Sequence, residues 1–222
     1  MPASLSLTLT FPRGIVQTFP KHPPATCAKT ANGHAIQYSK AALDAAPIVQ
    51  DLGWDISHAR RLVHVLDALD RNRSAMKQVY RLADEDLPPP DLAKRFATQL
   101  LASVWNRNAQ NPLFSNWMSG ANGWYRVAYD NGTGRCVAGS PPYALTNAFA
   151  TGGYITWARY YPLLATLGQT IYVASQSTEG DAGAYIHAYY PRLAFQTGDK
   201  PSQVQVIERL MFWPTLVAAA GR

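Results

Sequence analysis

Apolar residues recur at helical spacing through most of the chain after Ser39. The clearest stretch covers residues 56–72, where apolar side chains fall on one stripe and predict an amphipathic helix with Asp55 at its N-cap. The stripe consists of Ile56, Ala59, Leu62, Val63, Leu66 and Leu69.

Further helices are expected before this one and toward the C-terminus. The run Pro88–Pro90 separates two of them because proline cannot continue a helix, and Asp91 should cap the second of the two. Ser202 and Gln205 form a capping box for the last one. Pro162 and Pro214 should bend or split the helices that contain them. With short connections, these helices should pair as antiparallel hairpins. The expected ranges are 41–50, 74–86, 92–104, 143–150, 154–167 and 203–219.

Two parts of the chain break the helical pattern. Residues 1–38 begin with alternating leucines and continue into prolines, which predicts a short β arm followed by an extended linker. Residues 106–140 lose their periodicity and are rich in Asn, Gly, Trp and Tyr, and a loop of this length inside a compact domain is usually functional. The sequence thus predicts an N-terminal arm and one mainly α-helical domain, residues 39–222.

Composition limits the kinds of partner. No apolar run approaches the ~20 residues needed to span a bilayer, so membrane insertion is not expected. The net charge of +6 and the pI near 9.4 favour polyanions, but the basic residues are dispersed, which disfavours nucleic acid. The first ten residues show no signal-peptide pattern, so we expect a cytoplasmic protein unless such a segment, or a larger N-terminal part, is missing. In that case an extracytoplasmic location is expected.

No metal or cofactor is expected from the motifs. The chain has no P-loop, dinucleotide fingerprint, His-Glu-x-x-His pair or Gly-x-Ser-x-Gly elbow. Cys27 and Cys136 are too few for a zinc site, and their spacing does not decide between a disulfide and two free thiols.

The first candidate for chemistry lies at the start of the best helix. Asp55 and His58 are three residues apart and fall on one helical face, where the carboxylate can orient the imidazole for acid or base work. The alternative is that Asp55 only caps the helix and His58 is an ordinary polar residue.

The second candidate is the aromatic part of the loop. Glycan grooves combine flat aromatic faces with Asn and Arg side chains that satisfy hydroxyl and carboxylate groups. Trp117, Asn122, Trp124, Tyr125 and Arg126 supply this mixture within one short stretch. The alternative is that these aromatic rings pack beneath a long loop.

A third group of aromatic residues follows the loop. Tyr143, Tyr154 and Trp157 lie around a helix with a proline-rich entry and a Gly152-Gly153 exit, an order that looks like an inner helix of a toroid with substrate loops at its mouth. We therefore add Tyr143, Tyr154 and Trp157 to the candidate substrate-binding residues.

Three short motifs together resemble a known architecture. The Asp55-x-Ser-His58 helix start, the helix end at Val104-Trp105-Asn106 and the loop Asn122-Gly123-Trp124-Tyr125 are similar to helical hairpins of (α/α)-toroid glycan-active proteins, such as polysaccharide lyases and uronyl epimerases. The resemblance covers residues 39–167. A toroid normally needs more helices than this chain supplies, so the resemblance implies an incomplete or open ring, or one completed by another chain.

The resemblance implies a lyase or epimerase acting on an acidic polysaccharide or oligosaccharide. In that chemistry a base removes the proton next to a uronate carboxylate, and an acid protonates the leaving oxygen. His58 or Tyr125 is then the base, and Asn122 and Arg126 hold the carboxylate. Trp117 and Trp124 stack on the sugar, and Asp55 joins the substrate-binding residues.

An alternative hypothesis makes the protein a non-catalytic structural or assembly component. Trp, Tyr and Arg also dominate the hot spots of protein–protein interfaces, so the aromatic loop could be a contact surface in an oligomer. Oligomer formation through a buried aromatic loop favours this hypothesis, whereas a monomer with an open groove favours the glycan site.

Overall fold

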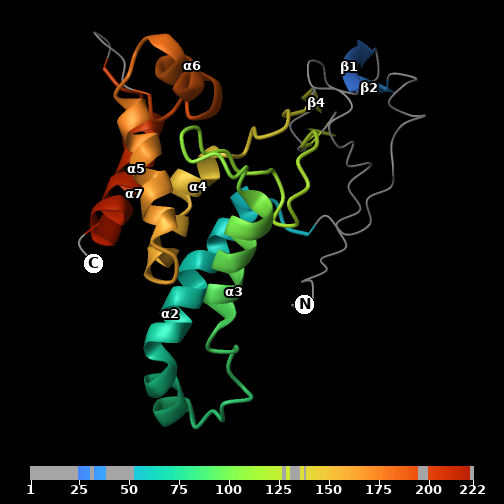
Figure 1. Cartoon of the computed structure of the whole chain (residues 1–222). Coiled ribbons are helices and arrows are strands. Elements are labelled where there is room, and N and C mark those ends of the chain that lie inside the picture. Colours follow the sequence, from blue (N-terminus) through green and yellow to red (C-terminus); the bar gives the residue numbers. More distant parts are fainter. Residues whose placement is uncertain are drawn as a thin grey trace.

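The computed structural model describes residues 25–30, 33–38, 53–126, 129–130, 136–137, 139–194 and 200–220. This part of the chain is mainly helical, as the sequence predicts (Figure 1). The longer elements are β1 (Ala25–Thr30), β2 (Gly33–Tyr38), α2 (Ile56–Tyr80), α3 (Leu92–Gln99), α5 (Leu163–Ser175), α6 (Gly180–Tyr189) and α7 (Gln203–Ala220). The shorter ones are a π turn η1 (Leu100–Val104), β3 (Tyr129–Asp130), β4 (Cys136–Val137), α4 (Asn147–Thr151) and a 3₁₀ helix η2 (Tyr154–Arg159).

The start of α2 confirms the cap and the apolar stripe. Asp55 Oδ1 accepts hydrogen bonds from the backbone N–H groups of Ser57 and His58, each at 3.0 Å, which is the N-cap geometry. Four residues of the stripe are buried and the other two are partly buried. The buried ones are Ile56, Ala59, Val63 and Leu66.

The end of α2 differs from the prediction. The helix continues without a break to Tyr80, so the separate helix expected at 74–86 is wrong. Arg73 holds the end of the helix to the following loop. Its guanidinium donates to the Pro88 carbonyl at 2.6 Å and pairs with Asp84 at 3.1 Å. The chain then returns as α3, which packs against α2 in the expected antiparallel hairpin (Figure 1).

The cap predicted for α3 is wrong. The Asp91 side chain makes no capping hydrogen bond to a backbone N–H. Its Oδ2 instead accepts from Arg95 Nε at 2.8 Å, one turn further along the helix. After Gln99 the helix widens into the π turn η1, which ends where the aromatic loop begins.

The C-terminal half agrees with the prediction at its prolines and its last cap. Pro162 splits the expected helix 154–167 into η2 and α5, and Pro214 lies inside α7. Ser202 N–H donates to Gln205 Oε1 at 2.9 Å and Gln205 N–H to Ser202 Oγ at 3.3 Å, so the capping box is confirmed. The sequence did not predict α6, and the helix expected at 143–150 is only the short α4.

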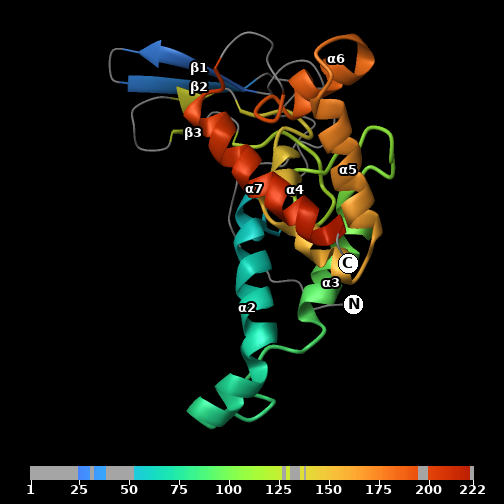
Figure 2. The ribbon, with the colours of Figure 1, turned by 90° about the vertical axis from the view of Figure 1, so that its left-hand side faces the viewer.

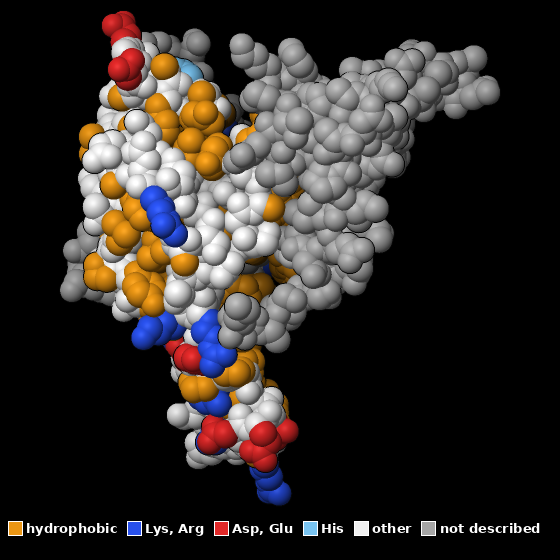
Figure 3. All heavy atoms as spheres, turned by 45° about the vertical axis from the view of Figure 1, so that its right-hand side comes forward, with side chains coloured by type: hydrophobic (Ala, Val, Ile, Leu, Met, Phe, Trp, Pro, Cys, Tyr) orange, Lys and Arg blue, Asp and Glu red, His pale blue; other side chains and the backbone are white. Residues whose placement is uncertain are grey.

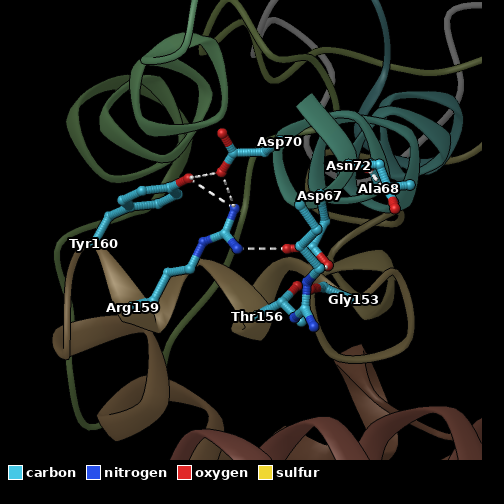
Figure 4. Close-up of polar contacts among 9 residues, drawn as sticks. Asp67, Ala68, Asp70, Asn72, Gly153, Thr156, Arg159 and Tyr160 are labelled. Carbon is cyan, nitrogen blue, oxygen red and sulfur yellow. Dashed lines mark hydrogen bonds and ion pairs between the residues drawn. The ribbon is translucent and has the colours of Figure 1, made fainter. Parts of the chain in front are cut away.

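The core lies where α4, η2, α5 and α7 meet the first half of α2. It contains large side chains that are fully or almost fully buried, including Phe114 stacked on Phe149 with ring centroids 3.9 Å apart. Arg159 ties η2 to the outer side of α2. Its Nη1 donates to Asp67 Oδ1 at 2.6 Å and its Nη2 to Asp70 Oδ2 at 3.2 Å (Figure 4).

The strands form two small sheets. β1 pairs with β2 in an antiparallel hairpin, and β3 pairs with β4. The linker predicted within residues 1–38 therefore contains paired strands at 25–30 and 33–38. The strand expected at the alternating leucines and the helix expected at 41–50 lie outside the described residues.

Candidate functional site

The Asp55 carboxylate is the centre of the candidate site. Asp55 precedes α2 and is only 7% exposed. Its backbone forms an isolated antiparallel bridge with Trp117, so the aromatic loop lies directly against the helix start. This contact brings residues that are far apart in the sequence around one carboxylate.

Three side chains converge on Asp55. His58 Nδ1 lies 2.5 Å from Oδ2, and the Tyr125 hydroxyl donates to the same oxygen at 3.3 Å. The Ser57 hydroxyl donates to Oδ1 at 2.5 Å. Both carboxylate oxygens are therefore engaged. The His58 side chain is 38% exposed, so the imidazole lies between this buried acid and the solvent.

Tyr125 is held tightly in the loop. Its backbone pairs with Ser140 through two hydrogen bonds, and its ring meets Trp117 edge to face at 5.9 Å. The Arg126 guanidinium lies 5.1 Å from the centre of the Tyr125 ring. Burial, followed by the nearby Asp55 charge, raises the pKa of Tyr125 to about 12. The phenol therefore remains protonated at neutral pH.

Asn122 has a different position from the one expected. Its side chain is 5% exposed, and Oδ1 accepts from the Tyr143 backbone N–H at 2.8 Å and from the Asn116 backbone N–H at 3.3 Å. These contacts hold the loop together. The amide oxygen is thus already used within the protein, and Tyr143 contributes its backbone to the loop.

The aromatic residues of the predicted groove are buried. Trp117 is 3% exposed and Trp124 is 7% exposed, so neither presents an open face in this conformation. This is the packing alternative that the sequence left open. Composition alone cannot separate the two cases, because the local sequence does not show whether a tryptophan ring is buried in a core or lines an open groove.

Tyr154 and Trp157 belong to the core behind α2. The Tyr154 hydroxyl donates to the Ile56 carbonyl at 2.7 Å, next to Asp55. Burial, and then the Asp55 charge, raise the pKa of Tyr154 well above its usual value. Trp157 packs between Tyr154 and Phe96, with centroid distances of 5.5 and 6.3 Å. Tyr154 thus supports the helix start, and Trp157 does not reach the Asp55 group.

Sequence reasoning missed the importance of Asn116. This residue is fully buried, and its Nδ2 donates to the carbonyls of Gly123 and Pro141, each at 2.9 Å. Its Oδ1 accepts from the Leu145 N–H at 3.0 Å. One side chain therefore fixes three loop segments around Asp55. The only sequence signal was an asparagine between Ser115 and Trp117 in the loop, which is too common a pattern to be informative.

A hollow on the surface lies elsewhere. It has a volume of about 600 Å³ and is lined mainly by α5, with single residues from α6 and α7, including Gln169, Val173, Ala182 and Leu216. None of the predicted site residues lines it. Among the described residues, no group of three or more His, Cys, Asp or Glu side chains is placed to hold a metal ion.

Comparison with known proteins gives no match: no family model, no curated protein and no solved structure is similar to the chain. The site must therefore be interpreted from its own geometry.

The raised tyrosine pKa values predict a loss of stability in alkali. A group whose pKa is higher in the folded state than in the unfolded state stabilises the fold. This contribution is fully present below the unfolded pKa, which is near 10 for tyrosine, and it is lost as the pH rises through the folded pKa. For Tyr125 the loss should occur from about pH 10 to about pH 12. We expect the free energy of unfolding to fall less steeply over this range in Tyr125→Phe than in the wild type, measured by urea denaturation at several pH values.

Tyr80→Phe is the matched control, because Tyr80 is 70% exposed at the end of α2. The free energy of unfolding of Tyr80→Phe should depend on pH in the same way as that of the wild type. Equal slopes for Tyr125→Phe and wild type would contradict the assignment of Tyr125 as a buried, protonated phenol.

Proposed function

We propose that the protein acts on an acidic polysaccharide, as a lyase or epimerase, through acid–base chemistry at His58 and Tyr125. The observation that carries the proposal is the shared Asp55 oxygen, 2.5 Å from His58 Nδ1 and 3.3 Å from the Tyr125 hydroxyl. A carboxylate bound to Nδ1 keeps the proton on that nitrogen, which leaves Nε2 as the base.

The pKa of Tyr125 decides which residue is the acid. A phenol with a pKa of about 12 is a poor base at neutral pH but holds a proton that it can donate. In a lyase, His58 Nε2 takes the proton on the carbon next to the uronate carboxylate. The electron pair of that C–H bond forms a C=C bond as the neighbouring C–O bond breaks, and the leaving oxygen takes the proton of Tyr125.

An epimerase uses the same first step. His58 removes the proton, no C–O bond breaks, and the carbon regains a proton on its opposite face. Tyr125 is the candidate donor for that proton. The two reactions therefore need the same pair of groups and differ only in the fate of the carbanion.

Charge supports an acidic substrate. The chain carries a net charge of +6, and Arg126 follows Tyr125 directly in the loop, where its guanidinium can neutralise the uronate carboxylate as negative charge develops. Stacking of a sugar on Trp117 and Trp124 is part of the proposal and requires the loop to open, because both rings are covered. In this proposal Asn122 supports the loop through its backbone contacts and does not hold the uronate carboxylate.

The toroid resemblance belongs to the same proposal. The helix start at Asp55, the helix end at Val104–Asn106 and the loop at Asn122–Tyr125 are the motifs that suggest it. The first and the last of them meet where the Tyr125 hydroxyl donates to Asp55 Oδ2. A closed ring would need helices from another chain, so the proposal includes an open ring or an assembled one.

The test is incubation of the purified protein in D₂O with a panel of uronate polysaccharides, including alginate, polygalacturonate and hyaluronan. A lyase gives an unsaturated product that absorbs in the ultraviolet. An epimerase gives incorporation of deuterium next to the carboxylate without cleavage, detected by NMR.

His187→Ala is the control variant, because His187 is exposed on α6, outside the Asp55 group. It should retain full activity. Absence of both unsaturated product and deuterium incorporation on every uronate substrate would overturn the proposed function.

A further inference from the structure

The last helix is apolar on both of its sides. Its inner side contacts α4, η2 and α5 and buries Phe212 and Leu216. At 100° per residue, its exposed large hydrophobic side chains all fall on the opposite half of the helix. These are Val204, Val206, Ile207, Leu210, Met211 and Val217, between 39% and 71% exposed, and we refer to them as the α7 outer face. A helix that is hydrophobic all round is normally buried on all sides.

No charge interrupts the α7 outer face. The helix has two charged residues, Glu208 and Arg209. Glu208 is buried and accepts from Arg192 at 2.6 Å and from Asn147 at 2.5 Å, whereas Arg209 donates to the Ala194 carbonyl at 2.5 Å. The neighbouring α5 has no charged residue at all.

The position of α7 makes this face accessible. α7 lies at the front of the helical body in Figure 2, crossing α4 and α5. Figure 3 shows charged side chains around the α2–α3 hairpin and also at the opposite end of the helical body, with hydrophobic and uncharged side chains over much of the surface between them.

We infer that the α7 outer face binds the same face of a second copy of this chain. Two copies with a net charge of +6 repel each other, and a surface without charged side chains is where they can approach with the least repulsion. A two-fold axis pairs such a face with itself, without like charges in contact. Its six exposed side chains offer roughly 600 Å² per copy, close to the ~800 Å² per partner of a standard interface.

Other occupants fit less well. A charged partner such as nucleic acid or an acidic peptide finds no ionic group on this face. A helix that lies on a membrane surface is usually rich in Lys and Arg on its polar side, whereas the one basic residue of α7, Arg209, donates to the Ala194 carbonyl. No helix within the described ranges is long and apolar enough to cross a bilayer.

The experiment is sedimentation velocity of the full chain over about a hundredfold concentration range, together with light scattering for mass. The wild type should be a dimer that dissociates on dilution. Leu210→Glu places a charge at a side chain that is 62% exposed on the α7 outer face and should raise the dimer dissociation constant at least about tenfold.

Val79→Glu is the matched control, because Val79 is 69% exposed on α2, away from α7. It should dimerise like the wild type, and circular dichroism should show that both variants are folded. A wild type that is monomeric throughout, or a dimer that Leu210→Glu leaves intact, would overturn the inference. So would sedimentation of monomers with phosphatidylserine vesicles that Leu210→Glu abolishes. The inference does not rest on the proposed catalytic site, because His58 and Tyr125 play no part in it.

Discussion

A His58→Ala variant should lose at least about a hundredfold in kcat on the uronate substrate that the wild type converts, because a positioned base contributes about 10²- to 10⁴-fold. KM should change little, because His58 removes a proton and does not hold the sugar. Steady-state kinetics of the wild type, His58→Ala and His187→Ala provide the measurement. Unchanged kcat in His58→Ala would remove His58 from the mechanism.

Asp55→Asn is a companion variant that separates the role of Asp55 in orienting His58 and Tyr125 from its role in folding. Asparagine is as good an N-cap as aspartate, so α2 should still begin at the same residue. The amide carries no charge and cannot accept at both oxygen positions, so His58 Nδ1 and the Tyr125 hydroxyl lose their shared acceptor. We expect lower kcat with nearly unchanged thermal stability. A large loss of stability would instead indicate that the Asp55 group is mainly structural.

Asn116→Leu should lower the free energy of unfolding by about 3 kcal/mol. The leucine side chain has a similar size but leaves the carbonyls of Gly123 and Pro141 and the N–H of Leu145 without their partner. Gly123 lies in a buried part of the loop, where water cannot replace the lost bond. Urea denaturation followed by tryptophan fluorescence measures the change.

Asn108→Leu is the control for this prediction. Asn108 also accepts hydrogen bonds from two backbone N–H groups, but it is exposed, so water can replace its side chain. Its change in stability should stay below about 1 kcal/mol. Similar losses in the two variants would show that the loop is not held by the buried amide.

Local chemistry made several elements predictable. The cap at Asp55, the stripe that follows it and the capping box at Ser202 and Gln205 depend on residues within a turn or two of each other. Pro162 separated two helices for an equally local reason, because it lacks an N–H group. The sequence contains all the groups that take part in these features.

Other elements were missed because local signals were absent or misleading. Gly180 and Gly183 lower the helix propensity of residues 180–189, yet α6 forms because Tyr185 and Ile186 pack into the core. The apolar stripe of α2 ends at Leu69, but no proline or glycine between Leu69 and Tyr80 stops the helix. Packing therefore explains α6, whereas the contacts of Arg73 with Pro88 and Asp84 accompany the longer α2.

The sequence by itself determined the helical class, the main caps and the pairing of Asp55 with His58 on one face of a helix. Only the tertiary structure decided that Tyr125, seventy positions along the chain from Asp55, meets the same carboxylate, and that the tryptophans of the loop are buried. It also decided that α7 exposes apolar side chains on its outer face. Caps and helical faces depend on neighbours a few residues away, whereas burial depends on which segments pack together across the whole chain.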